Sequence, residues 1–186
     1  QTFKALAREH RRQFDIPVVG ITGTNGKTTT ATLVKEMLTA AGHKVGLIGT
    51  VQYEIGDVIK PSKNTTPLPA EYFALLAEMR DAGCDSVVME VSSFGLEQHR
   101  IGKTHFAAAV FTNLTQDHLD YHHTMEAYKQ AKCKLFEMIT PEEGHTCIIN
   151  RDEPAAPDFI RACRANVITC SLHPGADLYV EDLHMD

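Results

Sequence analysis

The residues best suited to chemistry begin with a glycine-rich run, TGTNGKTT, between a short apolar stretch and a helix-like stretch. Glycines in such a turn let backbone N–H groups surround phosphate oxygens, and the following helix N-terminus adds its positive dipole end. Lys27 can reach the terminal phosphates, and Thr28 supplies a hydroxyl for Mg²⁺. Ile21 stands where the general phosphate-loop spacing places a glycine, so the loop is a shortened variant. We expect phosphate binding by Gly23, Thr24, Asn25, Gly26, Lys27, Thr28 and Thr29; the alternative is a glycine-rich turn with an incidental lysine.

Four further polar groups could take part in chemistry. Glu90 ends the apolar stretch DSVVMEV, and a carboxylate there could hold Mg²⁺ through its oxygens, although a solvated strand-end glutamate is the alternative. His118 follows the stretch FAAAVFTNL and could be a second cation ligand, a phosphate partner or an ordinary loop residue. Residues 64–67 (NTTP) would pass for a plain turn without context. Ser92 and Ser93 lack the GxSxG context of a serine hydrolase, which excludes that activity.

Strands and helices alternate along the chain, which predicts an α/β fold with a mostly parallel sheet flanked by helices. Thr124 is a plausible N-cap, Pro69 suits a helix start, and Gly42 and Gly83 suit helix ends. A turn is expected at Gly56-Asp57. Strands are expected over 16–21, 44–51, 85–92, 106–114, 146–150 and 167–171, and helices over 2–14, 31–42, 69–82, 124–139 and 154–165.

The polar runs TGTNGKTT, EVSS and NLTQDH each come directly after an apolar strand. In parallel sheets of this kind, ligands bind beyond the carboxyl ends of the strands. We therefore expect all three runs to converge on one edge of the sheet.

The composition of the chain limits the class of protein and the cellular compartment to which it can belong. The 186 residues suit one domain, and 18 Lys+Arg against 24 Asp+Glu give a net charge of −6, which disfavours non-specific nucleic-acid binding. No stretch has the length of a membrane span, and no signal-peptide pattern opens the chain. The five scattered cysteines contain no CxxC pair, which argues against a disulfide framework or a zinc site. We expect a cytoplasmic monomer.

Taken together, the motifs TGTNGKTT, NTTP, MEVSS-x-GLEQHR, VFTNLTQDHLDYH and MEAYKQAK closely resemble the central ATP-binding domain of the Mur ligase family. The resemblance runs from about residue 15 to 180. TGTNGKTT alone is shared with folylpolyglutamate and cyanophycin synthetases, whereas EVSS…QHR combined with NLTQDHLDYH is much narrower. The best match is to members that add a diamino acid to UDP-N-acetylmuramoyl-L-alanyl-D-glutamate.

The resemblance assigns a role to each motif. It implies that Lys132, in MEAYKQAK, is carbamylated; the alternative is a solvated helix lysine. Relatives usually read EVSSH, so Phe94 is a departure with no expected role beyond packing. By resemblance the magnesium ligands are Thr28, Glu90, His118 and Lys132, the catalytic residues are Lys27, Lys132, Glu90 and His118, and the contacts to the nucleotide-sugar dipeptide are Asn64, Thr65, Thr66, Ser92, Gln98 and Arg100.

The activity implied by the resemblance is ATP-dependent amide ligation in peptidoglycan precursor synthesis, with ATP and Mg²⁺ and through an acyl phosphate. Residues 1–186 would be a shortened central domain, because family members also carry an N-terminal UDP-binding domain and a C-terminal amino-acid-binding domain. On that basis, the 186-residue chain alone is expected to be inactive. Three alternatives stay open: a phosphate-loop kinase or nucleotide switch, a non-catalytic ATP-binding module, and a ligase resembling folylpolyglutamate or cyanophycin synthetase.

Overall fold

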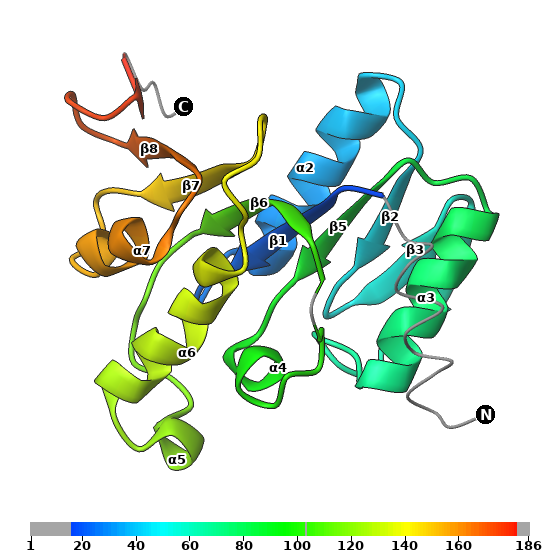
Figure 1. Cartoon of the computed structure of the whole chain (residues 1–186), viewed down its shortest axis with the longest axis horizontal. Helices are drawn as coiled ribbons and strands as arrows, with labels where there is room; N and C mark the ends of the chain where they lie inside the picture. The colour runs from blue at the N-terminus through cyan, green and yellow to red at the C-terminus, as the bar shows by residue number, and fades with distance from the viewer. Residues whose placement is uncertain (1–15, 103, 182–186) are drawn as a thin grey trace, which may run out of the picture.

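The computed structural model describes residues 16–102 and 104–181. These residues form a domain built on one nine-stranded sheet (Figure 1). The strand order is β4-β3-β2-β5-β1-β6-β7-β8-β9. The β3 strand pairs antiparallel with both β2 and β4, and the other pairings are parallel, as predicted. The strands are β1 (Val18–Thr22), β2 (Val45–Ile48), β3 (Gln52–Ile55), β4 (Val58–Pro61), β5 (Ser86–Glu90), β6 (Phe106–Phe111), β7 (Thr146–Asn150), β8 (Asn166–Ser171) and β9 (Leu178–Tyr179).

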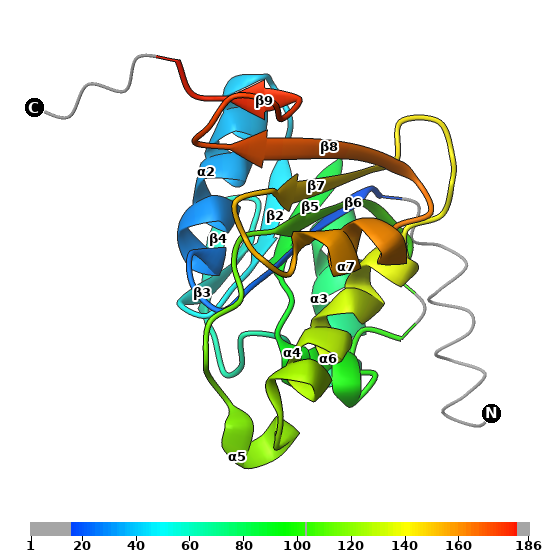
Figure 2. The same ribbon diagram turned by 90° about the vertical axis from the view of Figure 1, so that its left-hand side faces the viewer.

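Helices cover both faces of the sheet, so the domain has three layers (Figure 2). The α2 helix packs on one face, where Ala31 joins a buried cluster with Ile21 and Val88. The larger core lies on the opposite face, under α3, α6 and α7. The helices are α2 (Lys27–Ala40), α3 (Pro69–Asp81), α4 (Ser93–Glu97), α5 (Leu119–His122), α6 (Met125–Glu137) and α7 (Ala156–Ala162).

Several helix boundaries follow the sequence signals. Pro69 occupies the first turn of α3, and Gly83 follows that helix in a left-handed conformation with φ +78°. Gly42 adopts φ +96° directly after α2. The Thr124 side chain accepts a hydrogen bond from the Ala127 N–H, which confirms it as the N-cap of α6.

One further turn confirms the sequence expectation, and some helices differ from it. The turn at Gly56-Asp57 is present, and it makes β3 and β4 an antiparallel hairpin at the sheet edge. The helix expected over 154–165 is shorter, because it begins at Ala156, with Pro157 in its first turn. The short helices α4 and α5 were not expected, and the helix predicted over 2–14 lies outside the described residues.

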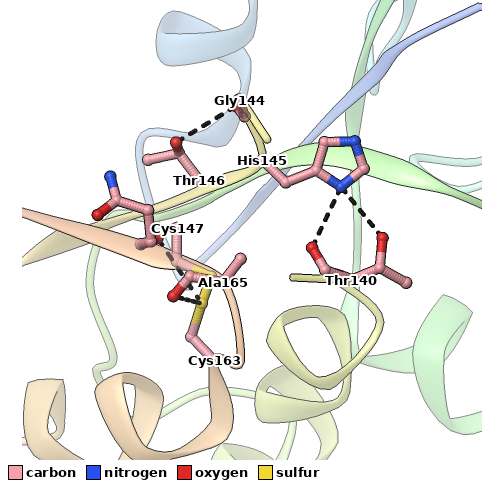
Figure 3. Close-up of a disulfide and its surroundings, with 8 residues drawn as sticks. Thr140, Gly144, His145, Thr146, Cys147, Cys163 and Ala165 are labelled. Atoms are coloured by element: carbon pink, nitrogen blue, oxygen red, sulfur yellow. Dashed lines mark hydrogen bonds between the residues drawn. A yellow bond between two sulfur atoms is a disulfide. The ribbon is translucent and has the colours of Figure 1, made fainter. Parts of the chain in front are cut away.

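The cysteine pattern argued against a disulfide framework, but the structure contains one disulfide within the described residues. Cys147 on β7 and Cys163 at the end of α7 form a disulfide with a Cα–Cα distance of 6.5 Å (Figure 3). Their separation of 16 residues carries no motif, and the pairing arises because α7 folds back against β7. Cys84, Cys133 and Cys170 are free thiols. Within the described residues, no helix combines the length and apolarity that a membrane crossing requires.

Candidate active site

The glycine-rich loop joins the carboxyl end of β1 to the first residue of α2, as predicted. Gly23 has no room for a side chain, because the Thr112 hydroxyl lies 1.9 Å from the position that a Cβ would take. The same hydroxyl donates a hydrogen bond to the Asn25 carbonyl at 2.7 Å. Gly26 adopts φ +81° at the N-cap of α2, a left-handed conformation that glycine adopts without strain. The loop therefore depends on both glycines and on the neighbouring strand.

The residues after β6 hold the loop from the side. The Thr24 N–H donates to the Asn113 carbonyl at 2.9 Å, and the Asn25 N–H donates to the Asn113 side chain at 2.8 Å. The Thr115 N–H donates to the Thr24 hydroxyl at 3.0 Å. These bonds confirm that TGTNGKTT and NLTQDH converge on one edge of the sheet.

Lys27 folds back over its own loop. Its ammonium donates to the carbonyls of Gly23 and Thr24 at 3.0 and 2.8 Å. Burial lowers the pKa of Lys27, and the carboxylates of Glu90 and Asp117 partly oppose that shift. The Lys27 ammonium is therefore bound to two neutral carbonyls of the loop. A phosphate oxygen could replace these carbonyls as its hydrogen-bond acceptor.

Lys132 reaches the same loop from α6. It is 1% exposed, and its Nζ donates to the Gly23 carbonyl at 2.8 Å while lying 4.5 Å from the centre of the Tyr128 ring. Burial, followed by repulsion from Lys27, lowers the pKa of Lys132 to about 7. A solvated helix lysine is therefore excluded, and a sizeable fraction of this amine is neutral near pH 7.

Glu90 is 1% exposed and hydrogen-bonded on both carboxylate oxygens, which excludes a solvated strand-end glutamate. Its Oε1 accepts from the Thr28 hydroxyl at 3.0 Å and from the Thr50 N–H at 2.8 Å. Its Oε2 accepts from the Thr50 hydroxyl at 2.9 Å. The sequence analysis missed Thr50, although this residue ends the stretch KVGLIGT and so belongs to the same sheet edge.

His118 lies apart from this carboxylate. It caps α5 with φ +53°, and its ring packs edge-on against Phe94 with 4.9 Å between ring centres. Its Nε2 lies 3.5 Å from Asp117 Oδ2, and its ring centre lies 6.0 Å from that of Tyr128. These are aromatic and loop contacts, so the structure brings His118 to the same edge of the sheet without joining it to Glu90.

Thr66 links the residues 64–67 to the end of β5. The residue is 1% exposed, and its hydroxyl donates to the Glu90 carbonyl at 3.1 Å. The same oxygen accepts from the Ser92 N–H at 2.9 Å and lies 3.1 Å from the Ser92 hydroxyl, and Ser92 in turn caps α4 at Gly95. The Arg100 guanidinium donates to the Thr66 carbonyl at 3.0 Å. We call Thr66, Ser92, Gln98 and Arg100 the Thr66 hub.

The remaining dipeptide candidates lie around this hub. Arg100 donates through Nε and Nη2 to Gln98 Oε1 at 2.9 and 2.8 Å. The Thr65 hydroxyl lies 3.0 Å from the Thr50 hydroxyl, which connects residues 64–67 to the partner of Glu90. Asn64 is placed through its carbonyl, which accepts from the Tyr53 hydroxyl at 3.1 Å.

A partly buried aromatic cluster extends from α4, beside the hub, to the phosphate loop. Phe94 packs against the rings of Tyr121 and His122, and the His122 Nε2 lies 2.9 Å from the Ser93 hydroxyl. Tyr128 extends the cluster toward the loop, where its hydroxyl lies 3.3 Å from that of Thr24. The sequence analysis assigned Phe94 to packing, but only the fold reveals that the packing connects the two sides.

The comparisons agree with this geometry. The family profile described as the Mur ligase middle domain matches residues 21–186. UDP-N-acetylmuramoyl-L-alanyl-D-glutamate--2,6-diaminopimelate ligases from Aquifex aeolicus and Bacillus cereus are 44% and 42% identical over 173 and 172 residues, covering 90% of this chain and 35% of each relative. A solved structure of a ligase with that name superposes with a TM-score of 0.80 at 31% identity, covering 90% of this chain and 34% of the other.

The chain thus spans about a third of the length of these relatives, at 35%. The matched range includes the phosphate loop and the residues of the Thr66 hub. The chain therefore belongs to the Mur ligase family, and it matches the middle domain of that family.

Proposed function

We propose that this chain is the central ATP-binding domain of an amide ligase that extends UDP-N-acetylmuramoyl-L-alanyl-D-glutamate by a diamino acid. The observation that carries the proposal is that the phosphate loop, the Thr28–Glu90 pair and the Thr66 hub share one edge of the sheet. The curated relatives are named for 2,6-diaminopimelate, and we extend that amino acid to the complete protein. The UDP-binding and amino-acid-binding parts would lie outside residues 1–186.

On the nucleotide side, residues 23 to 29 would surround the ATP phosphates, with the Lys27 ammonium exchanging two carbonyl acceptors for phosphate oxygens. The Thr28 hydroxyl and the Glu90 carboxylate lie 3.0 Å apart and offer the hard oxygen ligands that Mg²⁺ prefers, so the residues fit that ion. When bound, Mg²⁺ would neutralise charge on the phosphates. We assign His118 to a second metal position, which a small movement of its exposed ring would have to complete.

We propose that Lys132 carries a carbamate in the active enzyme. The lone pair of the neutral amine would attack the carbon of CO₂, forming one N–C bond and turning one C=O bond into C–O⁻, while the nitrogen loses a proton to water. Burial beside Lys27 supports this step, since it favours the neutral amine and disfavours a second ammonium. The product is an anionic oxygen ligand where a cation would repel a metal ion.

On the other side of the aromatic cluster, the Thr66 hub would receive the dipeptide. Arg100 presents a guanidinium held by Gln98, a suitable partner for an anionic substrate group. Asn64 and Thr65 are partly exposed beside it, and Ser92 is partly buried. The Thr66 hydroxyl is buried and fully used, so we assign it to positioning these neighbours.

In the proposed reaction, the substrate carboxylate forms a bond to the γ-phosphorus as the bond to ADP breaks. The amine of the diamino acid then attacks the acyl carbon of this acyl phosphate, and a proton and phosphate leave as the amide forms. Because an anionic carboxylate approaches an anionic phosphate, Lys27 and Arg100 would lower the barrier through their positive charge. No residue is required as a covalent nucleophile.

The proposal is tested by assaying amide formation in the full-length protein that carries this chain. We expect ADP release to require both the UDP-linked dipeptide and the diamino acid. Lys132→Ala should lose most activity and regain part of it with short carboxylates, whereas Lys132→Arg should stay inactive because arginine keeps its charge and forms no carbamate. Phosphorylation of a hydroxyl substrate instead, or nucleotide binding with no turnover, would contradict the proposal.

A further inference from the structure

Thr22, the last residue of β1, carries a hydroxyl that no group among residues 16–102 and 104–181 hydrogen-bonds. The residue is 0% exposed, and its Oγ1 is the buried side-chain polar atom that lacks a hydrogen-bond partner within the described residues. Its backbone carbonyl is engaged by Thr112, so only the side chain is unpaired. A buried hydroxyl without a partner is unfavourable, and such groups usually have a structural or chemical reason.

The strand geometry decides which way this side chain points. Side chains alternate between the two faces of a strand, so Thr22 shares a face with Gly20 and not with Ile21. Ile21 packs toward α2, together with Ala31. A Cβ at Gly20 would lie 3.0 Å from the Leu135 side chain, which places the Gly20 face against α6. The Thr22 hydroxyl therefore faces α6, away from the Thr28–Glu90 pair.

On α6, Lys132 is a polar residue on the surface that faces this strand, and the Tyr128 hydroxyl, one turn earlier, contacts Thr24. Lys132 lies three residues before Leu135, and therefore on the same face of the helix. Leu135 packs at Gly20 and the Lys132 ammonium reaches the Gly23 carbonyl, so these two α6 side chains contact residues that precede and follow Thr22 in the chain. The unmodified lysine makes no hydrogen bond with this hydroxyl, and its ammonium form offers donors but no acceptor.

We propose that the Thr22 hydroxyl donates a hydrogen bond to the carbamate of Lys132, and that Thr22 is the positioning residue that stabilises and orients this modification. The inference rests on the proposed function, because it needs the carbamate. The modification replaces a donor by two acceptor oxygens on the side of the sheet whose core includes Met89, Phe111 and Leu135. It would therefore satisfy the buried hydroxyl, and the hydroxyl would in turn favour the bound CO₂.

The test measures carbamate on this 186-residue chain with ¹³C-labelled bicarbonate and MgCl₂, using ¹³C NMR. Lys132→Met identifies the Lys132 signal by removing it. Thr22→Val keeps the shape and removes the donor, and we expect it to need about ten-fold more bicarbonate for half-occupancy, as for a lost bond to a charged acceptor. Thr22→Ser keeps the donor and should stay within about two-fold of wild type.

Thermal unfolding in bicarbonate-free buffer shows whether the variants fold. Because valine replaces an unpaired hydroxyl, Thr22→Val should unfold at the wild-type temperature or above it. Thr104→Val is the matched control, since the Thr104 hydroxyl donates to Ile101 and contacts Tyr72. It should unfold at a lower temperature and leave the carbamate signal unchanged.

The outcomes separate the two proposals. Equal occupancy in wild type and Thr22→Val, or an equal loss in Thr22→Ser and Thr22→Val, would overturn the role of Thr22 and leave the carbamate in place. If wild type gave no Lys132-dependent signal, the carbamate itself would be refuted together with this inference. Nucleotide binding through Lys27 would be untouched by either result.

Discussion

The phosphate-loop side and the Thr66 hub differ in how their polar groups are paired. On the first side, Lys27 and Lys132 both donate to the carbonyl of Gly23, so two cations share one neutral acceptor in a largely buried place. In the hub, the Thr66 hydroxyl is saturated by Glu90 and Ser92. The first side therefore holds unfavourable positive charge that an anion would relieve, whereas the second is assembled before any ligand arrives.

The largest expected effect concerns the charge of Lys132. Its folded pKa of about 7 lies below the ordinary value of 10.5, so between these values the unfolded chain binds more protons. Burying the charged amine therefore destabilises the folded protein fully below pH 7, and this destabilisation disappears as the pH rises toward 10.5. We expect Lys132→Met to be more stable than wild type at pH 6, with an advantage that shrinks by up to about 1.4 kcal/mol per pH unit above pH 7.

Urea unfolding of both proteins at pH 6, 7, 8 and 9 in bicarbonate-free buffer measures this difference. Lys129→Met serves as the control, since Lys129 is paired with Glu126 and Asp158 at the surface of α6 and its pKa is raised. A constant difference between wild type and Lys132→Met over this pH range would mean that no buried charge is being relieved.

The next effect concerns nucleotide affinity. Lys27→Ala removes the ammonium aimed at the phosphates, and we expect the affinity for a non-hydrolysable Mg·ATP analogue to fall about 10- to 100-fold, as for a lost charge-assisted hydrogen bond. Lys134→Ala should change it little, because Lys134 pairs with Glu97 at the surface. Calorimetric titration of the chain measures both. Equal affinities in wild type and Lys27→Ala would remove the phosphate loop from the proposal.

In the hub, the expected effect is on stability rather than on affinity. Thr66→Val leaves the partly buried Ser92 N–H without its acceptor, and we expect a loss of about 1–3 kcal/mol in the free energy of unfolding. Because no titrating group is involved, the loss should be the same at pH 6 and pH 9, in contrast to Lys132→Met. Urea unfolding at the two pH values measures it, and a loss that depended on pH would show that the two sides are electrostatically coupled.

The sequence predicted the parts of this architecture that depend on local signals. The alternation of strands and helices, the Thr124 cap and the glycines after two helices depend on local signals, and the cap and the glycines were found where expected. The convergence of TGTNGKTT and NLTQDH was also predictable, since carboxyl ends of parallel strands meet at one edge. Family resemblance supplied residue roles that spacing alone does not carry, and these remain proposals.

Features that depend on tertiary packing were not predictable in the same way. The burial of Lys132 follows from how α6 lies on β1, and a lysine among other helix lysines gives no sign of it. The Cys147–Cys163 bond depends on the return of α7 to β7. The unpaired hydroxyl of Thr22 is likewise visible only once the neighbours on its face of the sheet are known.

The smallest expected effect tests whether the two sides are separate. Arg100 contacts Gln98 and the Thr66 carbonyl, and none of its described hydrogen bonds reaches the phosphate loop. Arg100→Ala should therefore leave the affinity of this chain for the Mg·ATP analogue within about two-fold of wild type, while in the full-length protein it raises KM for the UDP-linked dipeptide and not for ATP. Arg100→Lys keeps the charge but loses the planar fork, so a recovery of KM would assign the effect to charge and no recovery would assign it to geometry. A fall in nucleotide affinity as large as that of Lys27→Ala would mean that the aromatic cluster transmits changes across the site, and that the two sides form one unit.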